Sequence, residues 1–149
     1  MTKIVLFLYL IVYKMYKFNI PILPELINKI FIRLLFGCQI GTGAKLGRNV
    51  ILAYGGLGIV IHHRSIIGNN VNIGSGVTIG GTSGKFQVPS IGNNTIISSG
   101  AKIIGPVKIG NNCIIGANAV VLSDIEDNCV AVGIPAKIIK RNINIKDYL

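Results

Sequence analysis

The stretch LAYGGLGIVIHH, residues 52 to 63, holds the side chains of this sequence that are best suited to move a proton. It contains Tyr54 and the adjacent His62 and His63, and the chain has no other histidine. Imidazole has an ordinary pKa of about 6.5, so it can take a proton from a hydroxyl group at neutral pH. A tyrosine, with a pKa of about 10, is a poor base unless its surroundings shift that value. The two histidines are therefore the candidate bases.

A six-residue repeat in the sequence indicates which structural elements carry these residues. An aliphatic residue recurs at every sixth position from 61 to 121, with one exception at residue 85. A helix needs a period near 3.6, and the triplet GNN at 68, 92 and 110 supplies corners, because Gly and Asn tolerate positive φ. The pattern predicts a mainly β fold, a parallel β-helix of hexapeptide repeats with coils of about 18 residues. The inward residues include Ile67, Ile73, Ile91, Ile97, Ile109 and Ile115.

Two interruptions break this pattern. Ile40, Leu46 and Leu52 also recur every six residues, but three positions out of phase with the later set, which predicts an insertion around AYGGLG. In GGTSGKFQVPS, residues 80–90, the phase survives but Lys85 takes an inward position. A buried unpaired lysine is costly, so we expect this segment to leave the coil as a loop.

Three hexads per coil would stack positions that lie 18 apart. On this count His63 is expected against Gly81 and Ser99, and His62 against Gly80 and Ser98. Tyr54 lies before the phase shift and is expected one corner earlier, too far for a direct pair with either histidine of its own chain.

Upstream of the repeat, residues 3–18 and 23–36 have helical apolar spacing, and Pro24 with Glu25 forms a first helical turn. We expect these helices to cap the first coil, whose edge would otherwise be exposed. The predicted organisation is a helical lead-in and cap at 1–37, the β-helix at 38–139 with its loop at 80–90, and a tail at 140–149.

Composition and net charge limit the kinds of molecule that this protein is expected to bind. The net charge of +10 favours an anionic one, and nucleic acid, anionic lipid and a phosphate-bearing cofactor all qualify on charge alone. Neither a bare nucleic-acid binder nor a bare membrane-surface binder has a dedicated motif in this sequence. Three cysteines without CxxC spacing indicate neither a disulfide framework nor a metal site. The apolar run KIVLFLYLIVY is too short to span a bilayer and lacks a cleavage site, which favours a cytoplasmic protein. An interfacial helix stays open, because Lys3, Lys14 and Lys17 flank the run.

The segments GGLGIVIHHRSIIGNNVNIGSGVTIGG and IIGANAVVLSDIEDNCVAVGIPAKIIKR resemble the hexapeptide-repeat acyltransferases. The resemblance is greatest to the branch that contains serine acetyltransferase and its relatives in surface-polysaccharide gene clusters. It implies a left-handed parallel β-helix, a homotrimer with active sites between subunits, and acetyl-CoA as the donor. The family's catalytic histidine maps onto Tyr54, and a second histidine, before the proline of the loop, maps onto Val88. Neither histidine is present here.

The resemblance also implies a CoA groove, and corners rich in small residues suit one. Its expected lining is Gly81, Ser98, Ser99, Gly100, Ala101, Ala117 and Asn118, with Gly133, Pro135 and Ala136 at the adenine end. The phosphates need cations, for which the candidates are Lys102, Lys137, Lys140 and Arg141. In the alternative interpretation these are ordinary corner residues and solubilising lysines.

The sequence thus predicts an acetyl-CoA-dependent O-acetyltransferase whose acceptor is a sugar hydroxyl in surface-polysaccharide synthesis, since the lead-in is short beside the helical domain of typical serine acetyltransferases. Two alternatives stay open: serine O-acetyltransferase, and a noncatalytic CoA-binding homologue. For catalysis, the hypothesis is that Tyr54 fills the family's base position and that His62 or His63 of the adjoining chain supplies the imidazole. The competing interpretation makes both histidines ordinary corner residues.

Overall fold

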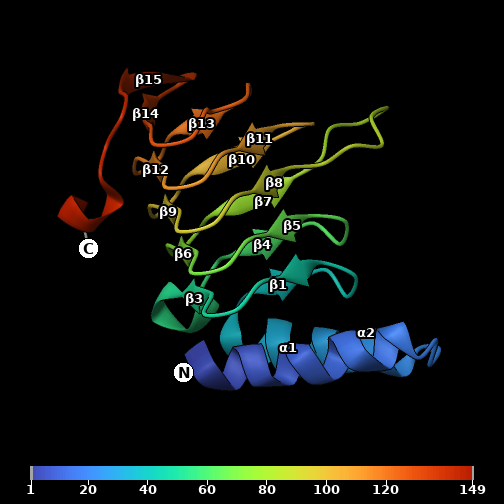
Figure 1. Cartoon of the computed structure of the whole chain (residues 1–149). Helices are drawn as coiled ribbons and strands as arrows, with labels where there is room; N and C mark the ends of the chain where they lie inside the picture. The colour runs from blue at the N-terminus through green and yellow to red at the C-terminus, as the bar shows by residue number, and fades with distance from the viewer. Residues whose placement is uncertain (1, 149) are drawn as a thin grey trace.

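The computed structural model describes residues 2–148, which form a prism of short parallel strands closed at one end by two helices (Figure 1). The first helix is α1 (Thr2–Lys17); the second begins as α2 (Leu23–Ile27) and continues as the π-helix η1 (Asn28–Leu34). Face A of the prism consists of β1 (Gln39–Ile40), β4 (Val60–Ile61), β7 (Thr78–Gly80), β10 (Lys102–Ile104) and β13 (Val120–Val121). Face B consists of β2 (Lys45–Leu46), β5 (Ile66–Ile67), β8 (Ser90–Ile91) and β11 (Lys108–Ile109). Face C consists of β3 (Ile51–Leu52), β6 (Asn72–Ile73), β9 (Ile96–Ile97), β12 (Ile114–Ile115), β14 (Val130–Gly133) and β15 (Ala136–Lys140).

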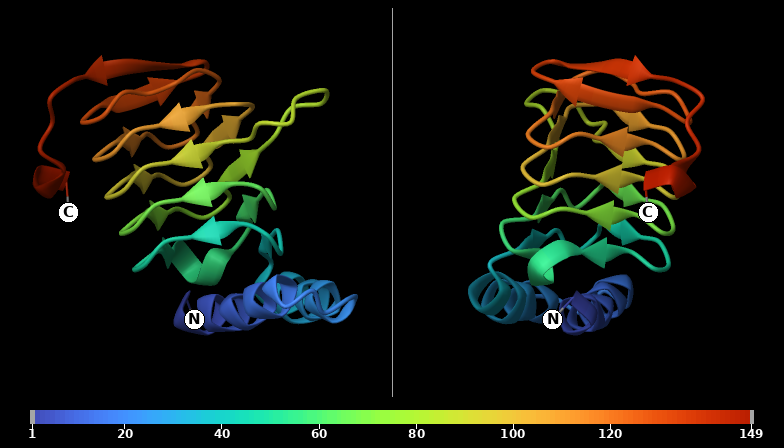
Figure 2. Two further views of the ribbon diagram at one scale, coloured as in Figure 1. Left: turned by 45° about the vertical axis from the view of Figure 1, so that its right-hand side comes forward. Right: turned by 90° about the vertical axis from the view of Figure 1, so that its left-hand side faces the viewer.

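The chain visits faces A, B and C in turn, and each coil lies on the one before it (Figure 2). We name the corners by the faces they join: corner AB, corner BC and corner CA. In each two-residue strand of the repeat, the second residue points inward and stacks in register on its counterpart, as Ile61 does on Ile79 and Ile79 on Ile103. These inward residues are at most 3% exposed from 61 to 121. The predicted β-helix and its inward set are confirmed.

The number of residues per coil varies more than a strict six-residue repeat predicts. Hydrogen bonds join equivalent positions 21 apart in the first coil, 24 apart across the loop, 18 apart next and 16 apart in the last coil. The first excess is the predicted insertion, which forms the 3-10 segment η2 (Ala53–Gly56). The second is the loop after β7, in which Lys85 is exposed, as expected.

The loop changes which residues stack on one another, so the predicted stacking of Ser98 and Ser99 against the histidines is wrong. Because it removes a whole hexad from the coil, Ile97 stacks on Ile73, and Ser99 lies on Ser75 with the two Oγ atoms 3.3 Å apart. Ser98 and Ser99 therefore belong to corner CA. They do not lie against His62 and His63, which occupy corner AB.

Corner BC is held by a ladder of asparagines with positive φ. The side-chain amides of Asn49, Asn70, Asn94, Asn112 and Asn128 are hydrogen-bonded in sequence, at 2.8–3.1 Å from one coil to the next. Their φ values of 53° to 58° are tolerated by asparagine better than by most side chains. The expected role of the Gly-Asn corners is confirmed.

The helices cover the first coil. The Tyr9 hydroxyl lies 2.6 Å from the carbonyl oxygen of Ala44 and 3.0 Å from that of Gly41, and the Asn28 side chain donates to the carbonyl of Ile40 at 2.6 Å. Side chains of the helices thus donate to carbonyls at the open edge of the first coil, of which only that of Ile40 belongs to β1. At the other end β15 adds to face C as an antiparallel strand, and η3 (Ile145–Tyr148) follows.

The three cysteines, Cys38, Cys113 and Cys129, are buried free thiols. Burial raises the pKa of the Cys38 thiol to about 11, so it stays protonated and unreactive. Among residues 2–148, no group of three His, Cys, Asp or Glu side chains is placed to hold a metal ion.

Candidate active site

His62 and His63 lie at corner AB, directly after strand β4. Their rings are in contact, with centroids 4.3 Å apart and planes tilted by 33°. The backbone of His63 lies so close to Gly41 of the first coil that a Cβ there would be 2.4 Å from the His63 Cα. A glycine at position 41 is therefore required for the histidine pair to occupy this corner.

The tautomer of His62 follows from its hydrogen bond. The backbone N–H of Arg64 donates to His62 Nδ1 at 3.2 Å, so the neutral ring carries its proton on Nε2. Burial, with smaller contributions from His63 and the Arg64 guanidinium, lowers the pKa of His62, which favours this neutral form. No hydrogen bond to the His63 ring occurs within the described chain, so a nitrogen of His63 is free to accept a proton. His62 can thus donate a hydrogen bond through Nε2, and His63 can accept a proton at a ring nitrogen.

The loop of residues 80–90 returns beside His62. A Cβ built on Gly81 would lie 3.2 Å from Cγ1 of Val88 and 3.9 Å from Nε2 of His62, so these two side chains are near neighbours. Arg64 braces the loop, because its guanidinium lies 4.2 Å from the centroid of the Phe86 ring. The imidazole of His62 therefore lies close to Val88, the position where the resemblance expects a histidine.

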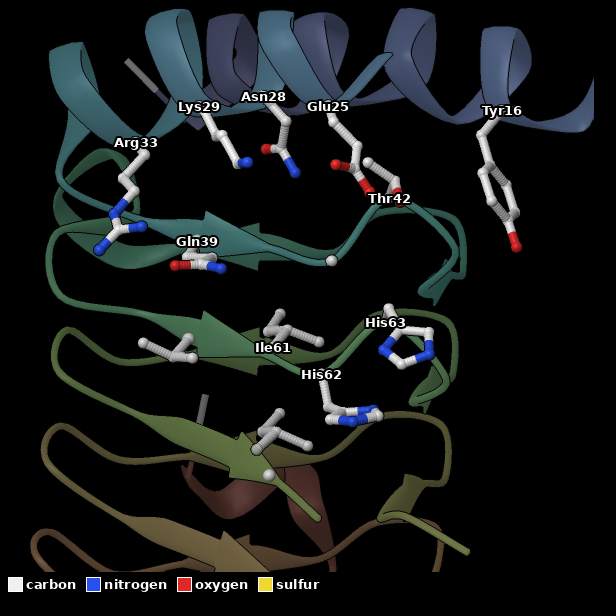
Figure 3. Close-up of a pocket in the computed structure, with 14 residues that line it drawn as sticks. Tyr16, Glu25, Asn28, Lys29, Arg33, Gln39, Thr42, Ile61, His62 and His63 are labelled. Atoms are coloured by element: carbon white, nitrogen blue, oxygen red, sulfur yellow. The ribbon is translucent and has the colours of Figure 1, made fainter. Parts of the chain in front are cut away.

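A cavity of about 500 Å³ opens between the helical cap and this corner (Figure 3). His62 and His63 form part of one wall, and the opposite wall carries charged and polar side chains from the second helix. These are Glu25, Asn28, Lys29 and Arg33, with Tyr16, Gln39 and Thr42 nearby. The cavity combines one carboxylate, two cations and two imidazoles.

The charged residues of the cavity are not paired with one another. Glu25, Lys29 and Arg33 follow at intervals of four, one turn apart on the helix, yet none of them forms an ion pair with a described residue. Asn28 is only 9% exposed, and its Oδ1 is buried without a hydrogen-bond partner. A buried acceptor without a donor is costly, so a ligand that supplies one would be stabilised here.

Sequence reasoning missed this second wall. The signal was the charged stripe formed by Glu25, Lys29 and Arg33 on a helix that is otherwise apolar. Their placement opposite the histidines depends on how the helix docks, which the repeat does not encode.

Tyr54 lies elsewhere on the same chain. It belongs to η2 at corner CA, has a φ of 51° and is 76% exposed. The chain crosses face A between Tyr54 and the histidines, so one chain does not bring them together, as the sequence predicts. Corner CA also holds Ser98, Ser99, Gly100, Ala101, Ala117, Asn118 and Gly133, the greater part of the expected CoA set. Gly81 is the exception, since it lies at corner AB.

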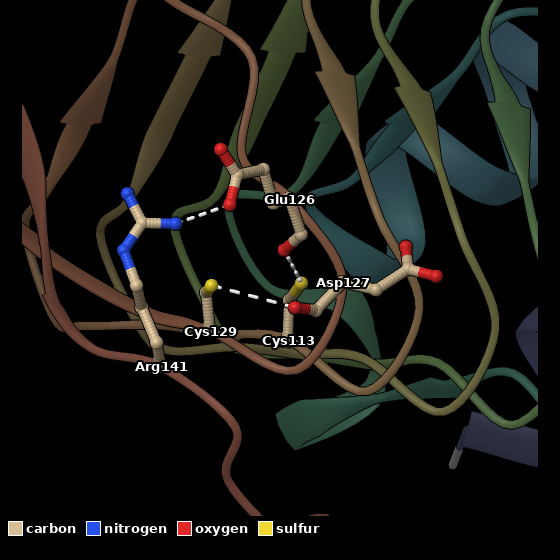
Figure 4. Close-up of polar contacts among 5 residues, drawn as sticks. All are labelled: Cys113, Glu126, Asp127, Cys129 and Arg141. Carbon is tan, nitrogen blue, oxygen red and sulfur yellow. Dashed lines mark hydrogen bonds and ion pairs between the residues drawn. The ribbon is translucent and has the colours of Figure 1, made fainter.

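The basic side chains expected to bind the CoA phosphates do not all lie at one corner. The Lys102 Nζ donates to the carbonyl of Gly76 at 2.5 Å, and Lys137 pairs with Val132, both next to corner CA. Arg141 follows the far end of β15 and is paired with Glu126 near corner BC (Figure 4). Lys140, at the end of β15, lies 3.3 Å from the Tyr148 hydroxyl.

Comparisons with known proteins agree with this architecture. The family described as bacterial transferase hexapeptide (six repeats) matches residues 89–123. The serine acetyltransferase of Synechococcus elongatus is 39% identical over 131 residues, which are 86% of this chain and 52% of that protein. The serine acetyltransferase of Staphylococcus xylosus is 40% identical over 137 residues, 90% of this chain and 62% of that protein.

Solved structures give the same match in three dimensions. The serine acetyltransferase of Neisseria gonorrhoeae superposes with a TM-score of 0.88 at 32% identity, over 94% of this chain and 55% of that one. A serine acetyltransferase in complex with CoA superposes with a TM-score of 0.83 at 32% identity, over 91% and 55%. The chain spans between half and two thirds of the length of these relatives. The resemblance to the hexapeptide-repeat transferases, in their serine acetyltransferase-like branch, is confirmed.

Proposed function

We propose that this chain, a hexapeptide-repeat transferase fold of the serine acetyltransferase type, catalyses transfer of an acetyl group from acetyl-CoA to the hydroxyl of serine. The observation that carries the proposal is the charged cavity facing the two histidines. The relatives are serine acetyltransferases, and this support favours serine over the sugar hydroxyl that the sequence alone made the first choice.

The charges of the cavity are complementary to those of a zwitterion such as a free amino acid. The guanidinium of Arg33 and the ammonium of Lys29 are placed to bind a carboxylate, for which the planar fork of arginine is well suited. Glu25 and the unpaired Asn28 Oδ1 are placed to accept from an α-ammonium group. A neutral sugar would leave these charges uncompensated. The acceptor hydroxyl would then lie on the histidine side of the cavity.

Acetyl-CoA supplies the acyl group as a thioester, whose carbonyl carbon the acceptor oxygen attacks. His63 takes the proton from that oxygen as the new ester bond forms, because its ring nitrogen is free to accept. The Nε2–H of His62 is available to donate toward the carbonyl oxygen, where negative charge develops. The proton held by His63 is then available to the departing thiolate.

We place the donor between corner CA of one chain and corner AB of the next in a homotrimer, which is the assembly implied by the resemblance. Corner CA fits an extended arm because its side chains are small, and Lys102 and Lys137 beside it are candidates for the phosphates. Arg141 is left out of this proposal, because it is paired with Glu126 away from that corner. Tyr54 would then lie across the subunit boundary from the imidazoles.

Thioester consumption with L-serine tests the proposal, with a monosaccharide as the competing acceptor and ethanolamine as the analogue without a carboxylate. We expect serine to be preferred, and Arg33→Ala to raise the KM for serine while leaving turnover of ethanolamine nearly unchanged. A preference for the sugar would instead restore the surface-polysaccharide function.

The histidines are tested by His62→Ala, His63→Ala and the double variant, with Tyr54→His beside them. Loss of a general base typically lowers turnover by about 10² to 10⁴. Wild-type turnover in the double variant would contradict the proposed base. A strong rise in turnover for Tyr54→His would show that the natural protein is an impaired enzyme, which favours the noncatalytic homologue.

A further inference from the structure

Helix α1 is apolar on two opposite sides. Val5, Tyr9 and Val12 are at most 1% exposed and pack on the first coil. Ile4 and Phe7, which helical spacing places roughly opposite to that buried side, are 55% and 63% exposed, and Phe7 also lines the edge of a groove beside the coil. A surface helix normally turns polar residues toward water, so an apolar outer side indicates a second apolar surrounding.

The second helix repeats this arrangement. Asn28 and Ile32 are buried against the coil, whereas Leu26, Ile30 and Leu34 are 48%, 44% and 77% exposed. The three exposed residues are spaced by four, so they form one stripe along the helix. The two helices lie side by side across the end of the prism (Figures 1 and 2). We call the exposed apolar residues of these adjacent helices the outer cap face: Ile4, Phe7, Ile11, Leu26, Ile30 and Leu34.

The charges of helix α1 have one sign. This helix carries Lys3, Lys14 and Lys17 and no acidic residue, whereas Lys29, Arg33 and Glu25 line the cavity on the inner side of the second helix. Lys3 and Lys14 are exposed on α1, and by helical spacing Lys14 lies on the same side as Phe7 and Ile11. Lysines in this position extend their ammonium groups past an apolar surface toward anions.

No helix in the described part of the chain is long and apolar enough to cross a membrane. Apolar stripes of this length, flanked by lysines, are instead typical of helices that lie in the interfacial region of a bilayer. We propose that the outer cap face docks on the surface of a bilayer that contains anionic lipid, with the helices parallel to the membrane plane. A second copy of the chain is a poorer partner, because two such faces would bring six α1 lysines together without an acid from either α1.

This inference does not rest on the proposed function. In the homotrimer that the fold family implies, chains arranged about an axis along the prism would place three outer cap faces at the same end. Three faces on one bilayer would bind with much higher avidity than one.

Flotation of the whole chain with phosphatidylcholine vesicles, with and without phosphatidylserine, tests the docking. Wild type should float with the anionic vesicles and far less with the neutral ones. The double variant Phe7→Ser with Ile11→Ser should lose binding, whereas the control Leu122→Ser, which changes an exposed leucine on the coil, should not.

Charge is tested separately. Lys3→Gln, Lys14→Gln and Lys17→Gln should each weaken binding to anionic vesicles about fivefold, as expected for roughly 1 kcal/mol per lysine. Lys108→Gln and Lys146→Gln, on the coil and the tail, are the matched controls. Absence of wild-type flotation on anionic vesicles would overturn the proposal. So would a doubling of the particle mass in sedimentation that Phe7→Ser abolishes, because the face would then be a contact between copies.

Discussion

The neighbours Ile66 and Ile67 in strand β5 offer a direct test of the stacked core. Ile67 is 2% exposed and stacks between Leu46 and Ile91, whereas Ile66 points outward and is 48% exposed. Replacing isoleucine by alanine removes three carbon groups, each worth about 0.8 kcal/mol when fully buried. For Ile67 the transfer cost is then about 2.4 kcal/mol, and the cavity left in the rigid ladder raises it to about 3 to 4 kcal/mol. For Ile66, which is about half in water already, the expected cost is about 1 kcal/mol.

Thermal unfolding and urea unfolding, each followed by circular dichroism, measure both variants beside wild type. The protein concentration must be fixed, because association makes apparent stability depend on it. We expect Ile67→Ala to lower the melting temperature by roughly 6 to 16 °C, about three times the change in Ile66→Ala. Equal losses in the two variants would refute the assignment of inward and outward residues.

Three further outcomes are expected. Tyr9→Phe should cost about 1 to 3 kcal/mol of unfolding free energy, because the buried carbonyl of Ala44 loses its hydroxyl donor, while Tyr13→Phe should cost little; similar values in urea unfolding would argue against the hydrogen-bonded cap. The Cys38 thiol should react with Ellman's reagent only after unfolding, and rapid labelling of the native chain would contradict its burial. Because the pKa of His62 is lowered, its contribution to stability should be complete above about pH 6.5 and be lost as the pH falls through the lowered pKa. The urea midpoint of His62→Gln should therefore fall less than that of wild type on acidification, and parallel curves would contradict this.

Much of the fold follows from spacing alone. The phase holds from Ile61 to Val121 because each position inside the coil must stack on another aliphatic residue, and the structure buries every aliphatic member of the series. The one charged inward position, Lys85, correctly predicts the loop, since a lysine has no partner inside the ladder.

The spacing of the aliphatic residues does not determine which residues share a corner of the prism. A hexad that leaves the coil keeps the phase of six but moves every later residue by one corner, so Ser98 and Ser99 were assigned to the wrong neighbours. The helix face that carries Arg33 toward His62 depends on docking between elements far apart in the sequence, and hydrophobic periodicity contains no information on it.

The loop after β7 has a consequence for how such a chain changes over generations. Since the ladders repeat every six residues, a gain or loss of one whole hexad within residues 80–90 leaves each downstream aliphatic residue facing inward. An insertion of any other length must leave the ladder, as the three extra residues at η2 do, or it would turn the downstream aliphatic residues outward. Within the loop itself side chains are free of that restriction, because residues 82–87 are exposed. The segment beside His62 can therefore diversify in sequence while the scaffold that holds it stays fixed, which separates the evolution of specificity from that of stability.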